Sequence, residues 1–187
     1  MPAAQVTGLV CAALIFYNHN EIRLVKWLII VVLGLLYNSV FLARVVRQVP
    51  LLKIFYVGLV WALVNSWLSY PGFDGNTFSI SFLFVTALVL PFDIRDMRQD
   101  EIVTFPRLIG VKRTKLLACV LVIISAVLAF WHLASIYAAA FGLTSAVTLI
   151  LIYFSENSRP DSYFSVWVEL CAALPLLFLL LLKMLGY

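Results

Sequence analysis

The chain is a series of long apolar runs separated by short polar segments. A helix needs about 20 apolar residues to cross a bilayer, and most of the runs approach or reach that length. The pattern predicts about seven membrane-spanning helices, of which the first is short for a crossing. The predicted spans are residues 3–17, 24–43, 51–70, 78–92, 116–132, 136–154 and 163–185.

Helix-breaking residues mark the ends of several predicted spans. Pro50 follows the second run, Pro71 and Gly72 end the third, and Pro160 lies in the polar segment before the last run. The connection between the fifth and sixth runs is very short, which predicts an antiparallel pair of helices. We therefore expect an all-α, polytopic transmembrane helical bundle that forms a single domain over residues 1–187.

Composition agrees with this class and excludes others. The chain is 64% hydrophobic and only 12% charged, so a soluble globular fold is excluded. The net charge of +4 is spread over loops, which gives no support to a nucleic-acid partner. Cys11, Cys119 and Cys171 lie in separate apolar runs without metal-ligand spacing, and we interpret them as buried thiols.

The basic residues predict how the bundle is oriented. Ten of the thirteen lie in or beside the 44–53, 93–115 and 155–162 loops, which we expect on one face of the membrane. Only Arg23, Lys26 and Lys183 belong to the other face. The positive-inside rule then places the three loops in the cytoplasm. We expect an integral multi-pass protein of a bacterial inner (cytoplasmic) membrane, with the 93–115 loop cytoplasmic.

The one long polar segment, residues 91–115, contains four of the nine acidic and six of the thirteen basic residues. If its first part is helical, Asp93, Asp96 and Asp100 lie within an arc of about 60°, and Arg95 and Arg98 point to the other side. Like charges on one helical face repel each other, and a cation between them would relieve the repulsion. Clustered carboxylates suit Mg²⁺. A solvated loop of mixed charge explains the same spacing and remains the alternative.

The order of residues in this segment resembles a known motif. The octapeptide DIRDMRQD is followed by Thr104, Pro106, Gly110 and Lys112. This arrangement resembles the second aspartate-rich motif of the UbiA-type intramembrane prenyltransferases, which reads D-x-x-D-x-x-x-D and continues with Thr-x-Pro and Gly-x-Lys.

The resemblance implies Mg²⁺-dependent transfer of a prenyl group from a polyprenyl diphosphate to a lipophilic or aromatic acceptor in the membrane. It assigns the metal to the three aspartates and the diphosphate to basic side chains around them. The implied metal ligands are Asp93, Asp96 and Asp100, and the implied diphosphate-binding residues are Arg95, Lys112 and Lys115.

The chain departs from the family in one respect. The family's first motif, N-x-x-x-D-x-x-x-D, has no counterpart, because Glu21 is the only acidic residue before Asp74. Stabilising a departing diphosphate needs preorganised positive charge on more than one side. We therefore expect an N-terminally shortened UbiA-like bundle that does not by itself transfer prenyl groups at a rate typical of the family.

There are two other interpretations, of which the second is disfavoured. A non-catalytic or truncated relative would act as a structural or interaction bundle. A CDP-alcohol phosphotransferase also uses membrane aspartates, but the chain lacks the Gly and Ala-Arg of that family's D-G-x-x-A-R motif. Among polar residues inside the spans, Asn38, Asn65 and Thr86 are interpreted chiefly as interhelical hydrogen-bonding groups, with lining a cavity as the alternative. Glu169 is either a functional carboxylate or a side chain that reaches the interface.

Overall fold

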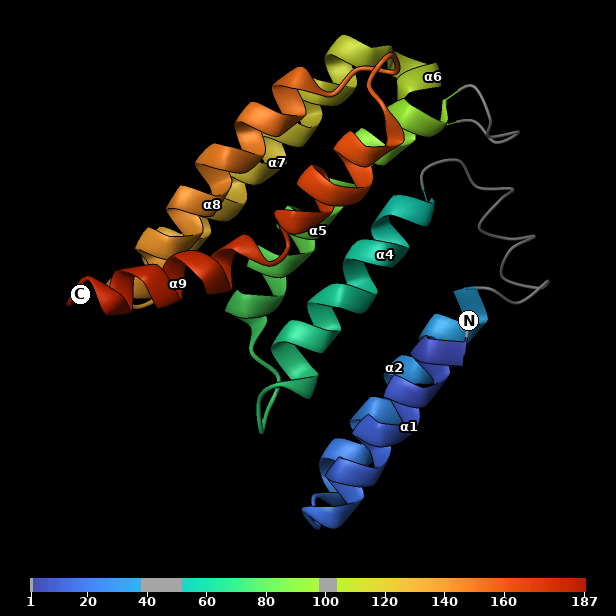
Figure 1. The fold of residues 1–187 in the computed structure, drawn as a ribbon, viewed down its shortest axis with the longest axis vertical. Coiled ribbons are helices and arrows are strands. Elements are labelled where there is room, and N and C mark those ends of the chain that lie inside the picture. The colour runs from blue at the N-terminus through green and yellow to red at the C-terminus, as the bar shows by residue number, and fades with distance from the viewer. Residues whose placement is uncertain (1, 38–51, 98–103) are drawn as a thin grey trace.

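The computed structural model describes residues 2–37, 52–97 and 104–187, and these residues form helices and turns with no β-strand (Figure 1). The predicted all-α class is therefore confirmed for the described chain. Three of its helices are long and apolar enough to cross a membrane by length and composition: α5 (Gly75–Asp96), α7 (Val111–His132) and α8 (Ser135–Phe154). They contain the predicted runs 78–92, 116–132 and 136–154.

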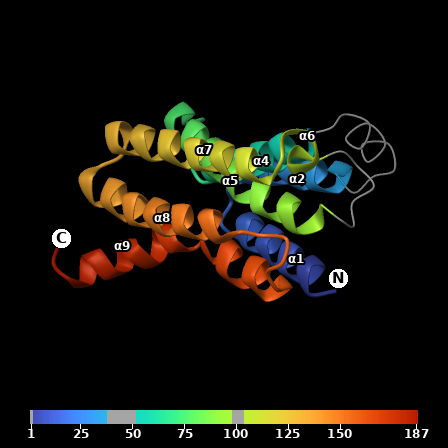
Figure 2. The same cartoon turned by 90° about the horizontal axis from the view of Figure 1, so that it is seen from above.

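Helix α5 is the centre of the bundle. It packs against α4 (Leu52–Leu63) on one side and α7 on the other, while α7 continues the layer by packing against α8 (Figures 1 and 2). Its buried face carries apolar residues such as Phe84 and Leu90, and Ser125 Oγ of α7 donates a 2.8 Å hydrogen bond to the Ile80 carbonyl. The connection between α7 and α8 is a tight turn, as predicted for an antiparallel pair.

The first two helices form a hairpin that lies beside α4 in Figure 1. They are α1 (Pro2–Tyr17) and α2 (Glu21–Tyr37), joined by a turn in which His19 has a φ of 52°. The part of the second predicted run beyond Tyr37 lies outside the described residues. With 16 and 17 residues, both helices are shorter than the three that qualify as spans by length.

Lys26 connects this hairpin to the rest of the bundle. Its side chain is buried, and its ammonium group donates hydrogen bonds of 3.0, 2.9 and 2.9 Å to the carbonyls of Trp67, Tyr70 and Pro71. These carbonyls lie at or just after the C-terminal end of the helix that begins as α4. Carbonyls at this end of a helix have no internal donors. The lysine therefore satisfies groups that an apolar environment would otherwise leave without partners.

Two segments depart from regular α-helix. Helix α4 continues as the π-helix η1 (Val64–Leu68), and a second π-helix, η2 (Tyr163–Val168), opens the last apolar run. A π-helix has i→i+5 hydrogen bonds and therefore more residues per turn than an α-helix, and it usually appears as a single turn inside an α-helix.

The last apolar run is not the single helix that the sequence predicts. Turn residues at 171–173 separate η2 from α9 (Leu174–Met184), which changes direction in Figure 1. Pro175 lies in the first turn of α9, a position where its missing N–H leaves no helical hydrogen bond unmade. The described structure therefore supports a multi-helix membrane protein with three long apolar helices and shorter ones around them. It does not establish seven spans.

Candidate functional site

The segment that carries the predicted metal ligands begins at the C-terminal end of α5. Asp93 and Asp96 both belong to this helix, and the helix passes through Pro91 without ending. The expected helix over residues 93–100 is confirmed as far as Asp96. Asp100, the third predicted ligand, lies outside the described residues, as does Arg98.

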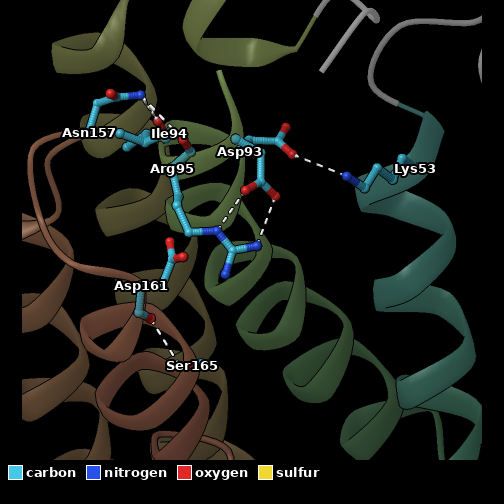
Figure 3. A network of polar contacts seen from close by, with 8 residues as sticks. Lys53, Asp93, Ile94, Arg95, Asn157, Asp161 and Ser165 are labelled. Atoms are coloured by element: carbon cyan, nitrogen blue, oxygen red, sulfur yellow. Dashed lines mark hydrogen bonds and ion pairs between the residues drawn. The ribbon is translucent and has the colours of Figure 1, made fainter. Parts of the chain in front are cut away.

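Asp93 is buried, with 2% of its surface exposed, and it faces the first turn of α4. Its Oδ1 lies 3.9 Å from the ammonium nitrogen of Lys53, so the two helices are joined by an ion pair at this end (Figure 3). A buried carboxylate is costly unless a charge or a hydrogen bond compensates it, and Lys53 supplies such a charge. From the sequence, Lys53 is interpreted chiefly as a determinant of orientation, with a position facing the same vestibule as the aspartates as the alternative; its ion pair with Asp93 favours the alternative.

Asp96 is held by its neighbour Arg95. The guanidinium donates from Nε to Oδ1 at 2.6 Å and from Nη2 to Oδ2 at 3.0 Å, a two-pronged pair of the kind that fixes both groups. The expectation that Arg95 points away from the aspartates is wrong. Adjacent helical positions diverge by about 100°, but a long arginine side chain bends back far enough to reach the next carboxylate.

Aromatic rings and a polar loop surround Arg95. Its guanidinium carbon lies 5.3 Å from the ring centre of Phe92 and 5.9 Å from that of Phe164 in η2. Figure 3 shows Asp161 close to the same guanidinium, and Asp161 and Glu169 both act on it electrostatically. Arg95 is therefore a cation that several elements of the bundle position.

The loop between α8 and η2 closes the end of α5. Asn157 Nδ2 donates to the carbonyls of Ile94 and Arg95 at 3.0 and 3.3 Å (Figure 3). These carbonyls belong to the last turn of α5, which lacks internal donors. Sequence reasoning missed Asn157, since an asparagine in a polar loop has no distinctive pattern.

The remaining motif residues shape the link from α5 to α7. The short helix α6 (Phe105–Ile109) begins after Thr104, has Pro106 in its first turn and ends at Gly110. Gly110 has a φ of 83°, in the left-handed region that favours glycine. The Thr-x-Pro and Gly positions therefore have a structural explanation as the start and end of one helical turn.

The two predicted lysines lie on the first turns of α7. Lys112 is exposed, and Lys115 donates a 2.9 Å hydrogen bond to the carbonyl of Tyr153 near the end of α8. Within the described residues, neither lysine makes a hydrogen bond or an ion pair with Asp93 or Asp96. The structure thus brings Asp93, Asp96 and Arg95 together with Lys53, and leaves the two lysines at the same end of the bundle without such contacts.

The described carboxylates offer Mg²⁺ a partial set of ligands. Over residues 2–37, 52–97 and 104–187, no group of three or more His, Cys, Asp or Glu side chains is arranged to hold a metal ion. Asp93 and Asp96 have the hard oxygen atoms that Mg²⁺ prefers, but Lys53 and Arg95 now neutralise them. A metal ion bound here would take over the role of at least one of these cations.

A cavity of about 650 Å³ leads towards this acidic end. We call it the crevice; it follows one face of α5 from Thr77 to Phe92, a span of about 22 Å at the helical rise. Residues of α4, η1, α8 and the η2–α9 segment form its other walls, and most are aliphatic or aromatic. Asn65 of η1 lines it as well and donates a 3.3 Å hydrogen bond to Ser81 of α5, so this residue serves both roles considered from the sequence.

Comparison with known proteins finds no matching family model, no matching curated protein and no matching solved structure.

Proposed function

We propose that this chain is a UbiA-like membrane protein that binds a polyprenyl diphosphate with Mg²⁺ at the acidic end of α5, for transfer of the prenyl group to an acceptor in the membrane. One observation carries the proposal: Phe92 is the last residue of α5 that lines the crevice, and the next residue in the chain is the buried Asp93, which is not itself part of the lining. An apolar crevice that ends at clustered charges suits a ligand with a hydrocarbon tail and an anionic head. Its volume falls in the range of small-molecule sites.

The residues at this end have complementary tasks in such a complex. Asp93 and Asp96 would hold Mg²⁺, and Asp100 is the third ligand that the motif implies. Mg²⁺, when bound, neutralises charge on the diphosphate oxygens. Lys53 and Arg95, released from their present carboxylates, are the nearest described cations for oxygens that the metal does not cover. Lys112 and Lys115 remain the more distant candidates.

The test is metal-dependent ligand stabilisation of the purified full chain in detergent. Geranylgeranyl diphosphate with Mg²⁺ should raise the melting temperature of the parent, and either component alone should raise it less. The Asp93→Asn/Asp96→Asn double variant should lose most of this response. Glu156→Gln, which neutralises an exposed carboxylate in a loop at the same end, is the matched control and should respond like the parent. If the melting temperature of the double variant rises with Mg²⁺ and geranylgeranyl diphosphate as much as that of the parent, the assignment of the site is wrong.

A second candidate function is that of a non-catalytic relative that acts as a structural or interaction bundle. The specific observation in its favour is that Asp93 and Asp96 are each already paired with a basic side chain, which gives them a structural role without metal. The missing first aspartate motif favours it too. If the purified chain transfers prenyl groups and Asp96→Asn abolishes the transfer, the result supports the enzyme. Binding of the diphosphate without transfer would decide for the relative.

A further inference from the structure

We propose that Glu169 is the residue that recognises the second substrate, by accepting a hydrogen bond from a hydroxyl group on a lipophilic molecule that occupies the crevice. The inference rests on the proposed function in one respect: it makes this molecule the acceptor of the prenyl group. The recognition itself, a hydroxylated lipophilic ligand held by a carboxylate in an apolar crevice, is independent of metal and diphosphate.

Glu169 is placed to meet such a ligand. It directly follows η2 and is the one acidic residue among those lining the crevice. Within the described chain, its carboxylate makes no hydrogen bond and no ion pair. An ionisable group inside a membrane bundle is costly and generally faces a partner, a cavity or the interface. Glu169 is exposed and lines the crevice, so a hydrogen-bond donor on a bound ligand would supply the partner that the described chain does not.

The depth of Glu169 fits a position between the two ends of the crevice. Phe164, earlier in the same segment, packs beside Phe92 with ring centres 6.3 Å apart, at the level of Arg95. Glu169 is five residues further along, and because most of this segment is π-helical it lies less than the roughly 7.5 Å deeper that five α-helical residues would give. Its charge still acts on Arg95. A hydroxyl bound to Glu169 would therefore lie just below the charged end, where the first carbons of a diphosphate-bearing chain would be.

The local backbone supports a functional reading of this position. The two π-helical segments of the described chain, η1 and η2, border the same crevice from different sides. Such segments interrupt the regular hydrogen-bond pattern of an α-helix, and they are frequently found at functional sites. One contributes the amide of Asn65 to the lining, and the other ends at the carboxylate of Glu169. Two independent departures from α-helix thus bring polar groups to an otherwise apolar cavity.

The class of ligand follows from the lining. Aliphatic and aromatic walls, among them Phe84 and Tyr137, favour a hydrocarbon or ring-containing body. A carboxylate accepts hydrogen bonds and does not donate them when ionised, so it selects a donor. A hydroxyl is the donor that a lipophilic molecule can carry into this environment at the smallest desolvation cost, compared with a charged ammonium.

The experiment compares two probes that differ only in the donor: geranylgeraniol and its methyl ether. Binding of radiolabelled geranylgeraniol to the purified full chain in nanodiscs is measured without Mg²⁺ or diphosphate, and each probe is used as competitor. The parent should bind the alcohol roughly tenfold more tightly than the ether, the typical effect of one hydrogen bond to a charged group. Glu169→Leu should abolish this preference, and Glu169→Gln should retain part of it, since an amide oxygen still accepts.

Glu156→Gln is again the control and should keep the full preference. Because the ether lacks the donor, its affinity should not fall in any variant, which shows that the crevice remains intact; in Glu169→Leu it should rise, since no carboxylate is then desolvated. Equal affinity of the parent for both probes, or an undiminished preference in Glu169→Leu, would overturn the inference. Since the assay contains neither metal nor diphosphate, its outcome is separate from that of the magnesium experiment, and either proposal can fail alone.

Discussion

Gly58 of α4 lies so close to Thr86 of α5 that a Cβ atom at position 58 would overlap the threonine hydroxyl. The same Cβ would lie 3.3 Å from the carbonyl oxygen of Phe82, which is backbone and has little freedom to move. Gly58 and Thr86 are both buried. The close approach sets the spacing of α4 and α5, the two helices whose charged ends carry Lys53 and Asp93. Small residues at helix contacts allow backbones in membranes to come this near.

Gly58→Ala should therefore destabilise the bundle by about 1–3 kcal/mol, the usual cost of overpacking. Reversible unfolding in mixed detergent would measure it. Gly142→Ala is the matched control: this glycine also lies inside a helix, but nothing lies within 4 Å of its added Cβ, so the change should be neutral or slightly stabilising. Adding Thr86→Ala to Gly58→Ala should recover part of the loss. Equal effects at positions 58 and 142 would contradict the predicted close contact.

Lys26→Met should loosen the N-terminal hairpin. The substitution keeps an unbranched apolar side chain but removes the donor to three carbonyls, and a hydrogen bond to a charged group contributes about 1.5–3 kcal/mol. We expect a loss of stability of roughly 2 kcal/mol or more, and faster proteolysis at the turn between α1 and α2. Lys183→Met changes an exposed lysine near the chain end and should have little effect. Indistinguishable behaviour of the two variants would show that the three carbonyls do not depend on Lys26.

Asp74 should make the stability of α5 depend on pH in acid. Its side chain caps the helix, accepting hydrogen bonds from Thr77 Oγ1 at 2.6 Å and from the Asn76 N–H at 3.1 Å. The Thr77 hydrogen bond is the main cause that holds the pKa of the Asp74 carboxyl below its usual value. A lowered folded-state pKa means that the stabilisation is complete above the unfolded value of about 3.9 and is lost as pH falls through the folded value.

Two variants separate the cap from the charge. Asp74→Ala should cost about 1 kcal/mol near neutral pH, and its difference from the parent should shrink in the acid range. Asp74→Asn retains a capping side chain that does not titrate, so its stability relative to Asp74→Ala should not depend on pH. Unfolding measured in detergent from pH 3 to pH 7 provides the comparison. A constant difference between the parent and Asp74→Ala over this range would contradict the prediction.

Membrane orientation can be tested with single cysteines. The described parts of the 93–115 and 155–162 loops lie at one end of the bundle with Lys53, and the turn around Gly72 lies at the opposite end (Figure 1). In a background without Cys11, Cys119 and Cys171, a cysteine at Gly72 should react with an impermeant maleimide from outside the cell. A cysteine at Ser158 should react only after permeabilisation. Labelling of both from the same side would overturn the predicted topology.

The sequence predicted the helices well wherever apolar character continues. Inside a bilayer every backbone group must be satisfied within the segment, so an apolar run of sufficient length becomes a helix. This argument does not predict how far a helix extends into the polar residues at its ends. Helix α5 extends beyond the run 78–92 in both directions, from its cap at Asp74 to Asp96. The break before α9 was marked only by Pro175, because the residues around it are as apolar as those of a continuous span.

The site was predictable to the extent that it depends on spacing along one helix. Asp93 and Asp96 both lie on α5, as the motif requires. Their ion pairs were not predicted: Lys53, which comes from another helix, was expected chiefly as a determinant of orientation, and Arg95 reaches Asp96 by bending its side chain back. The crevice has no signature in the sequence either. It arises from the way α4, α5, α8 and the last segment pack, and local periodicity does not determine such packing.

The length of η2 has a consequence for how this protein can change through insertion and deletion. Deleting one residue between Tyr163 and Val168 would allow the π-helix to close into regular α-helix, because a π-turn takes up about one residue more than an α-turn. The side chains that follow would keep nearly their present directions, so Glu169 would still line the crevice, whereas the same deletion in a regular α-helix would rotate every following side chain by about 100°. At this segment the chain can therefore lose a residue without changing which chemical group a ligand meets.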